Sequence, residues 1–363
     1  MRIIANLVRP VTSSFALSGS GGGVLVKKRP ATAALFAVSL SSYTTHSSFS
    51  QELVDKYDAF ILDQFGVLHN GAHALEGAIE LVNYLASDQK KKLIILSNTS
   101  APSDKAMLKL PKLGFEAHHF LGAVTSGEEA AKYIQAQYGA NSDTNDSSKA
   151  LMMTWDASDL TNPRLTALPE AFLEKCGPQI QLASTVEEAD WLLLHGSEVW
   201  YRGDGMDQLP LSFIETGSME SVVEPLLQQC LERNLPCICA NPDHIVQTPT
   251  GGTAYMPGAI AQRYQDMGGS VQWFGKPQPT HFLACLDVLG LPADRVAHVG
   301  DSLHHDISGA NQAGISNIFV TSGIHRSDLN VKFGELPKQE QLQDLFDREG
   351  GIIPTHVVPA FRR

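Results

Sequence analysis

The sequence lacks the features that would place it among membrane-spanning or disulfide-stabilised proteins. No apolar run reaches the roughly 18–20 residues that a helix needs to cross a bilayer. Cysteine is scarce, with five residues in 363, and an odd count in a long chain does not suggest a disulfide framework. Apolar residues make up 43% of the chain and charged residues 18%, as in ordinary globular proteins. We therefore expect a folded protein with no membrane partner.

Acidic residues are absent from the first 50 residues, which carry five basic residues and are rich in Ser, Thr, Ala and Gly. This composition is typical of a transit peptide, so we expect residues 1–50 to lie outside the fold. A mitochondrial address is the first expectation. A plastid address, a secretory segment around 31–40, or a disordered tail on a cytoplasmic protein are the alternatives.

The net charge of the whole chain is −12, so the acidic excess lies entirely after residue 50. A body with this charge repels a phosphate backbone, and we expect no nucleic-acid partner. An anionic substrate must then be attracted by a local cation or by a metal ion, because the overall field of the protein opposes its approach.

Strands and helices alternate from Gln51 onward, which predicts an α/β fold with a Rossmann-like parallel sheet between layers of helices. A middle stretch interrupts this pattern and has the elements of a second, smaller α/β unit. An insertion above the carboxyl edge of a sheet is suited to act as a lid. The expected domains are a split core at 51–126 plus 271–345, an inserted cap at 127–270, and a C-terminal tail at 346–363.

Four segments place residues used in phosphate chemistry after an apolar strand. Because the carboxyl ends of parallel strands meet at one edge of a sheet, we expect these residues to form one polar site. Each signal alone is weak, since an Asp after a strand is more often a helix cap and a Ser-Asn pair more often part of a turn. Together and in order they are specific: 59–67 with Asp63, 93–98 with Ser97 and Asn98, 274–277 with Lys276, and 296–301 with Asp301, followed by Asp306.

Asp63 is the candidate nucleophile, because a carboxylate can attack phosphorus and form an aspartyl-phosphate. A metal must offset the repulsion between two anions, and Asp63 with Asp301 is expected to hold Mg²⁺. The backbone carbonyl of Phe65 is a further expected ligand, since it does not depend on the side chain. Asp306 is expected either to orient metal-bound water or to pair with Lys276.

The remaining residues of the predicted site bind the phosphoryl group. Lys276 is expected to neutralise charge on both the nucleophile and the transferred phosphoryl group. Ser97 and the amides that follow it, including Asn98, are expected to hold phosphate oxygens at the start of a turn.

This ordered set resembles the haloacid dehalogenase-like hydrolase superfamily, and the insertion between Ser97 and Lys276 is similar to its large cap. The segments 239–243 and 300–307 narrow the resemblance to the class IIA, nitrophenylphosphatase-like branch. The resemblance covers about 51–330. It implies a Mg²⁺-dependent phosphatase for a small phosphorylated metabolite, and it places Asn241, as a substrate-binding residue, and Asp243 on the cap side of the cleft.

One residue departs from the family pattern, because Phe65 stands where such phosphatases carry a second Asp two residues after the nucleophile. That Asp protonates the leaving group and later activates water, and a general acid is typically worth about 10²–10⁴ in rate. His69, on the same loop, and the pair His304 and His305 are candidate substitutes, with a loop hydrogen bond and lining of the rim as the alternative interpretations. Substrates with good leaving groups, such as acyl phosphates, need no acid.

The first functional expectation is therefore a phosphatase that is slowed by Phe65. A metal- and phosphate-binding protein with a regulatory or scaffold role is the second, and a carbon–halogen hydrolase is the third. Retention of Asp301 and Asp306 argues for a metal and against the third. A buried nucleophile beside a like charge is costly to keep, which favours an enzyme. The exposed face of the cap is a candidate homodimer surface.

Overall fold

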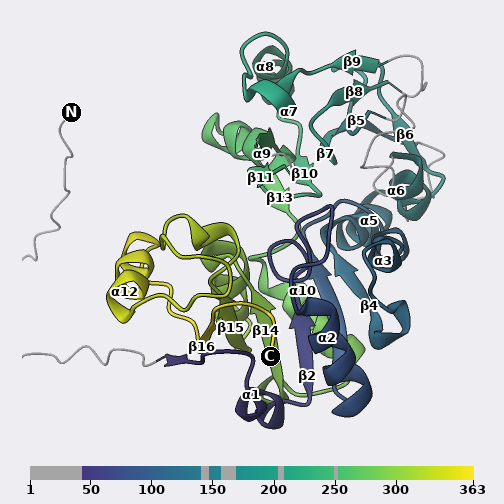
Figure 1. Ribbon diagram of the computed structural model, residues 1–363. Helices are drawn as coiled ribbons and strands as arrows, with labels where there is room; N and C mark the ends of the chain where they lie inside the picture. Colours follow the sequence, from purple (N-terminus) through teal and green to yellow (C-terminus); the bar gives the residue numbers. More distant parts are fainter. Residues whose placement is uncertain (1–42, 140–146, 157–168, 203–207, 249–251) are drawn as a thin grey trace, which may run out of the picture. The chain divides into compact units, whose positions relative to one another are not determined.

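The computed structural model describes residues 43–139, 147–156, 169–202, 208–248 and 252–363. The expected transit peptide lies almost wholly outside the described residues, so the address remains a prediction. The described chain forms a seven-stranded sheet, a second sheet and a short hairpin (Figure 1). Within these segments, no helix combines the length and the apolar character needed to cross a membrane.

The larger sheet has the strand order β1-β16-β15-β14-β2-β3-β4, and every neighbouring pair is parallel. Its central strands are buried on both faces, which explains their continuous apolar sequences. The strands are β1 (Thr44–Thr45), β2 (Ala59–Leu62), β3 (Lys92–Ser97), β4 (Phe120–Thr125), β14 (Val296–Gly300), β15 (Ser316–Val320) and β16 (His356–Val358).

Helices cover both faces of this sheet, as the alternation along β2 shows. Phe60 and Leu62 pack with residues of α1 (Gln51–Lys56) and α2 (Ala78–Asn83). Ala59 and Ile61 pack instead with α10 (Pro279–Leu289) and α11 (Ser308–Gln312). The predicted three-layer α/β core is therefore confirmed. The other helices of this part are η1 (Tyr84–Asp88), α3 (Ser103–Met107), α4 (Lys109–Lys112), η2 (Ala117–His119), η4 (Ala293–Arg295), η5 (Leu303–Ile307), η6 (Ile324–Arg326) and α12 (Gln339–Arg348).

The second sheet belongs to the inserted α/β unit and has the order β13-β10-β7-β5-β8-β9, with β6 beside β5. Its pairings are parallel except those made by β8. One face packs on α8 (Val223–Glu232) and α9 (Pro257–Asp266), the other on α5 (Ser126–Tyr138) and α6 (Pro169–Cys176). The remaining elements are β5 (Ser148–Thr154), β6 (Ile180–Leu182), β7 (Trp191–Leu194), β8 (Val199–Tyr201), β9 (Gln208–Pro210), β10 (Cys237–Cys239), β13 (Val271–Trp273), α7 (Phe213–Thr216) and the hairpin β11 (Ile245–Gln247) with β12 (Thr253–Tyr255).

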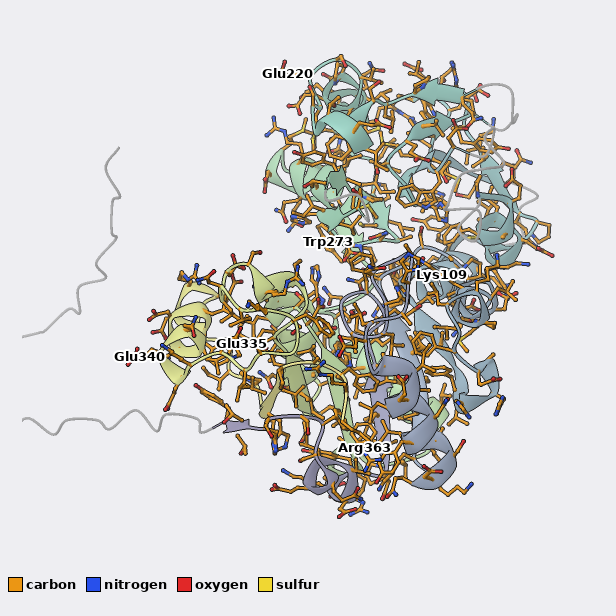
Figure 2. All side chains as sticks on the ribbon, in the orientation of Figure 1. Lys109, Glu220, Trp273, Glu335, Glu340 and Arg363 are labelled. Carbon is orange, nitrogen blue, oxygen red and sulfur yellow. The ribbon has the colours of Figure 1, made fainter. Side chains whose placement is uncertain are left out.

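Three boundaries differ from the sequence-based expectation. The stretch from 271 was expected in the core, but β13, which ends at Trp273 (labelled in Figure 2), pairs with β10 in the second sheet. Residues 346–363 were expected to form a C-terminal tail outside the core, but β16 is a strand of the core sheet. Residues before Gln51 were excluded from the fold, yet β1 pairs with β16 and Phe49 is buried. Strands of two or three residues are too short to show a periodic pattern, so only their partners reveal them.

Candidate active site

The carboxyl edge of the larger sheet gathers the acidic residues that the sequence singled out. Asp63 follows β2 directly, and Asp301 follows β14. Because β2 and β14 are parallel neighbours, both aspartates leave the sheet at the same edge. Carboxylate oxygens of Asp63, Asp301 and Asp306 lie within 4.8 Å of one another, and all three residues are buried. The structure therefore brings together residues from both halves of the split core.

Lys276 supplies the positive charge of this cluster. Its Nζ donates to Oδ1 of Asp63 at 2.6 Å and to Oδ1 of Asp306 at 2.7 Å. Only 3% of the residue is exposed. Burial opposes its charge, but the carboxylates of Asp306 and Asp63 outweigh burial and raise the pKa of Lys276. Lys276 therefore remains a cation and holds the candidate nucleophile in place.

Asp306 is satisfied by three protein donors. Its Oδ1 accepts from Lys276 and, at 2.9 Å, from Nε2 of His298, while its Oδ2 accepts the N–H of Ser302 at 3.0 Å. Burial raises the pKa of Asp306, but Lys276 and His298 outweigh burial and leave that pKa lowered. Of the two roles that the sequence left open for Asp306, the structure shows the pairing with Lys276.

Two histidines of the site were missed by reasoning from the sequence. His298 lies fully buried in β14 and donates to Asp306. His281, in α10, accepts the N–H of Gly275 at Nε2 (2.9 Å) and so fixes the turn before Lys276. A histidine inside an otherwise apolar strand was the available signal for His298. Nothing in the local sequence distinguishes His281 from a surface residue.

Two glycines make room for Asp301. Gly66 has φ +85°, and a β-carbon there would lie 1.9 Å from Oδ2 of Asp301. A β-carbon at Gly323 would lie 2.0 Å from the same oxygen. The N–H of Ile324 donates to this Oδ2 at 2.7 Å. The loop that carries Asp63 and Phe65 is therefore pressed against Asp301 in a way that only glycine allows.

The charges of the site fit a divalent cation. Burial raises the pKa of Asp63 to about 7, with Asp306 acting in the same direction and Lys276 against it. Burial likewise raises the pKa of Asp301, helped by Asp63 and Asp306. Three carboxylates beside one ammonium leave excess negative charge, and Mg²⁺ prefers such oxygen ligands. Asp63 and Asp301 therefore fit Mg²⁺, and the carbonyl of Phe65 on the same loop completes the ligand set that the sequence predicts.

Asn98 links the cap to the core. Its Oδ1 accepts the N–H of Lys276 at 2.7 Å, and its Nδ2 donates to Oδ1 of Asp243 at 2.7 Å. Asn241 is 3% exposed, and its Oδ1 accepts the N–H of Asp243 at 3.0 Å, which shapes the turn that presents Asp243. Both asparagines were predicted to bind phosphate or substrate. In the structure, Oδ1 and Nδ2 of Asn98 and Oδ1 of Asn241 have hydrogen-bond partners within the protein. Ser97 ends β3 half-buried at the same edge, and its Oγ accepts the N–H of Thr99 at 3.4 Å.

The structure supports a loop-hydrogen-bond role for His69. Its Nδ1 accepts the N–H of Gly71 at 3.1 Å, and its Nε2 lies 3.3 Å from Oε1 of Gln64. Burial lowers the pKa of His69 to about 3, so the ring is neutral. Phe65 packs edge-on against this ring, with the centroids 6.2 Å apart. His69 therefore shapes the loop of Asp63, and its one proton faces Gln64.

His304 and His305 lie in η5, between Asp301 and Asp306 in the sequence. His304 is exposed, and its ring lies 5.0 Å from that of His305. Nδ1 of His305 lies 3.6 Å from Oδ1 of Asp243, the same oxygen that Asn98 contacts. The predicted pair therefore lies between the acidic loop of the core and the Asp243 turn of the cap, and His305 adds to the link made by Asn98.

We expect Asp301→Asn to raise the thermal unfolding midpoint of the chelator-treated protein by a few degrees near neutral pH. The raised pKa of Asp301 means that its ionised form is disfavoured in the folded state. Its cost therefore begins above the unfolded pKa of about 3.9 and grows until the pH passes the folded pKa. The amide keeps the acceptor for Ile324 and removes the charge.

The same variant should lose the stabilisation that Mg²⁺ gives the wild-type protein, because the ion loses a carboxylate ligand. Thermal scans with chelator and with excess Mg²⁺ measure both effects. Asp344→Asn, at an exposed position of α12, is the control and should show neither effect. A lower midpoint for Asp301→Asn in chelator would contradict this account of the site.

Family models match both halves of the core. A haloacid dehalogenase-like hydrolase model matches residues 60–157, which include Asp63 and Ser97. A second model, described as HAD-hydrolase-like, matches residues 273–347, which include Lys276, Asp301 and Asp306. The two matches leave out most of the inserted unit.

Known phosphatases are similar to this chain, in sequence or in fold, along most of their length. The acid sugar phosphatase of Staphylococcus haemolyticus is 24% identical over 303 residues, which are 78% of this chain and 98% of the relative. The structure of p-nitrophenyl phosphatase from Archaeoglobus fulgidus has a TM-score of 0.56 at 21% identity and covers 85% of this chain and 97% of its own. The glycerol phosphate phosphatase of Mycobacterium tuberculosis in complex with magnesium has a TM-score of 0.56 at 19% identity, covering 85% and 77%. With its two family matches and a parallel core interrupted by an α/β cap, this chain is similar to the haloacid dehalogenase-like hydrolases and shares the fold of the nitrophenylphosphatase-like branch.

Proposed function

We propose that this protein is a Mg²⁺-dependent phosphatase that hydrolyses phosphate monoesters of small metabolites through an aspartyl-phosphate at Asp63. The observation that carries the proposal is the buried contact of Lys276 with both Asp63 and Asp306, beside the carboxylate of Asp301. A carboxylate held against an ammonium at an acidic sheet edge is suited to attack an anionic phosphorus centre. The phosphatase names of the relatives support the same chemistry.

Each residue of the site has a separate task in this reaction. Lys276 orients Asp63 and reduces the repulsion between its carboxylate and the incoming phosphate. Asp306 and His298 keep Lys276 at its place and charged. Ser97, with the amides after it, holds phosphate oxygens. Mg²⁺, when bound by Asp63, Asp301 and the Phe65 carbonyl, supplies the charge compensation that a phosphoryl transfer between anions requires.

We expect the purified protein to hydrolyse p-nitrophenyl phosphate with Mg²⁺, to lose this activity in excess chelator, and to regain it when Mg²⁺ is restored. The reason is that one ammonium cannot offset the charge of three carboxylates and a phosphate dianion. Release of p-nitrophenolate measures the rate. Hydrolysis that survives chelation would contradict the metal assignment.

A second candidate function is favoured by Phe65, since this residue removes the family's general acid. In that case the protein binds Mg²⁺ and phosphate without turnover and acts through a partner. Calorimetric titration with Mg²⁺ and inorganic phosphate, run beside the activity assay, separates the two functions. Binding without hydrolysis of any ester would favour the regulatory role.

Two further parts of the proposal concern the address of the protein, which the composition of the N-terminal region supports, and its assembly. We propose a mitochondrial address in residues 1–50, confined to the part before Tyr43, because Thr44 and Thr45 pair with β16 in the core sheet. We also propose a homodimer formed through the exposed face of the cap. Imaging of a tagged full-length chain and light scattering test these two points.

A further inference from the structure

The loop of the nucleophile offers no proton to a leaving group. In the described stretch from Asp63 to Gly71, the ionisable side chains are Asp63 itself and His69. His69 is 2% exposed, with Nδ1 taken by the N–H of Gly71 and Nε2 facing Gln64. Phe65, at the position of the missing acid, carries no proton to transfer. This loop therefore supplies no general acid for an ester whose oxygen must be protonated as it departs.

Asp306 and Lys276, two other buried charged residues of the site, already have hydrogen-bond partners within the protein. Asp306 accepts from Lys276, His298 and Ser302. Lys276 donates to two carboxylates, and giving up its proton would leave both of them buried without a cation. None of these groups is free to protonate a leaving oxygen, so the best leaving oxygen is one that is stable as an anion, such as that of a phenol or an enol.

Large apolar side chains are exposed on three segments that contact the site. Phe65 is 39% exposed and precedes Gly66, which touches Asp301. Ile324 is 49% exposed, and its N–H donates to Asp301. Ile245 is 44% exposed and lies two residues after Asp243 on the cap. Covering such side chains with an apolar group is favourable, because it removes apolar surface from water.

We propose that this site selects phosphate monoesters with an acidic leaving oxygen and an apolar body, namely aryl or enol phosphates, over phosphates of sugars and other alkyl alcohols. This inference rests on the proposed function and names its substrate class. The absence of a free acid on the nucleophile loop selects the leaving group, and the three exposed apolar side chains select the body attached to it.

The reaction balances without an acid from the protein. The carboxylate of Asp63 forms a bond to phosphorus, the ester P–O bond breaks, and its electron pair leaves with the phenolate or enolate. Water then attacks phosphorus of the aspartyl-phosphate, the bond from phosphorus to the Asp63 oxygen breaks, and dihydrogen phosphate is released. This product loses one proton in solution, where the phenolate or enolate takes up a proton, giving hydrogen phosphate and the free alcohol.

The test is the dependence of kcat/KM on the leaving-group pKa in the full-length protein with Mg²⁺. p-Nitrophenyl, phenyl and naphthyl phosphates are compared with glycerol and glucose phosphates. We expect a steep fall as the leaving group becomes less acidic. Phe65→Asp should raise kcat/KM for the alkyl phosphates by about 10²–10⁴. The gain should be far smaller for p-nitrophenyl phosphate, because its leaving group needs no acid and it loses the apolar contact with Phe65. Phe65→Asn, equal in size to Asp but with no proton to transfer, is the matched control and should give no such gain.

Binding of the apolar body of the substrate is tested separately, by measuring KM. Ile245→Ser and Ile324→Ser should raise KM for naphthyl phosphate far more than KM for glycerol phosphate. Val288→Ser, at an exposed apolar position of α10, should change neither value. Equal KM values for naphthyl phosphate in all four proteins would overturn the apolar part of the proposal.

Two negative outcomes separate this inference from the function on which it rests. Comparable kcat/KM for alkyl and aryl phosphates in the wild-type protein would overturn the selectivity and leave the phosphatase function intact. That result would assign the acid to a residue outside the nucleophile loop, such as His304. Failure to hydrolyse even p-nitrophenyl phosphate with Mg²⁺ would overturn the proposed function itself.

Discussion

Asp63→Asn is expected to lower kcat for p-nitrophenyl phosphate by on the order of 10⁴ or more, as when a catalytic nucleophile is removed. An amide cannot form an aspartyl-phosphate, and the other site residues only position and stabilise charge. The fold should persist, because the amide has the size of the carboxylate and removes one of three crowded buried charges. Lys276 keeps its contact with Asp306 in the variant.

The covalent intermediate gives a second readout for Asp63. Rapid denaturation during turnover, followed by mass spectrometry, should detect a phosphorylated peptide containing Asp63 in the wild-type protein and none in the variant. Asp58→Asn is the matched control. Asp58 lies just before β2, at the opposite end from Asp63, in an exposed pair with Arg295. It should retain wild-type kcat. Unchanged turnover in Asp63→Asn would reject this residue as the nucleophile.

The convergence of Asp63 and Asp301 could be predicted because it follows from a local rule. An apolar strand followed at once by a polar residue places that residue at the edge of a sheet, and parallel strands share that edge. The rule needs no knowledge of which strands are neighbours. It therefore succeeded across the insertion that separates Asp301 from Asp63. Lys276 follows β13, a strand of the second sheet, so this rule does not explain why Lys276 joins the site.

The parts that could not be predicted depend on partners that the local sequence does not name. β13 was expected to belong to the core, and only its pairing with β10 places it in the second sheet. Asn98 has the sequence context of a phosphate-binding turn, but its amide is used by Lys276 and Asp243, which lie far along the chain. His298 gains its role from Asp306, which is reached only when β14 and the following turn have folded.

Lys276→Met is expected to lower the free energy of unfolding by about 3–5 kcal/mol in chelator, because removing one partner leaves buried carboxylates uncompensated. Asp63 and Asp306 both lose the ammonium that lies within 2.7 Å of them. The loss in free energy of unfolding should be smaller at mildly acidic pH. The pKa of Asp63 is already raised to about 7 by burial, and it rises further without the cation, so protonation relieves the charge as the pH falls. Denaturant unfolding at mildly acidic and mildly alkaline pH measures this difference.

The double variant Lys276→Met with Asp306→Asn distinguishes a charge effect from a packing effect. It removes one of the two stranded carboxylates and keeps a side-chain oxygen that accepts from His298. We expect much of the lost stability to return, because a buried pair replaced on both sides costs little. Phosphatase activity should stay lost, since Asp63 still lacks the ammonium that orients it. If the double variant were as unstable as Lys276→Met at every pH, Lys276 would act mainly by filling space. Recovered stability without recovered turnover would instead show that the same ion pair serves both folding and catalysis.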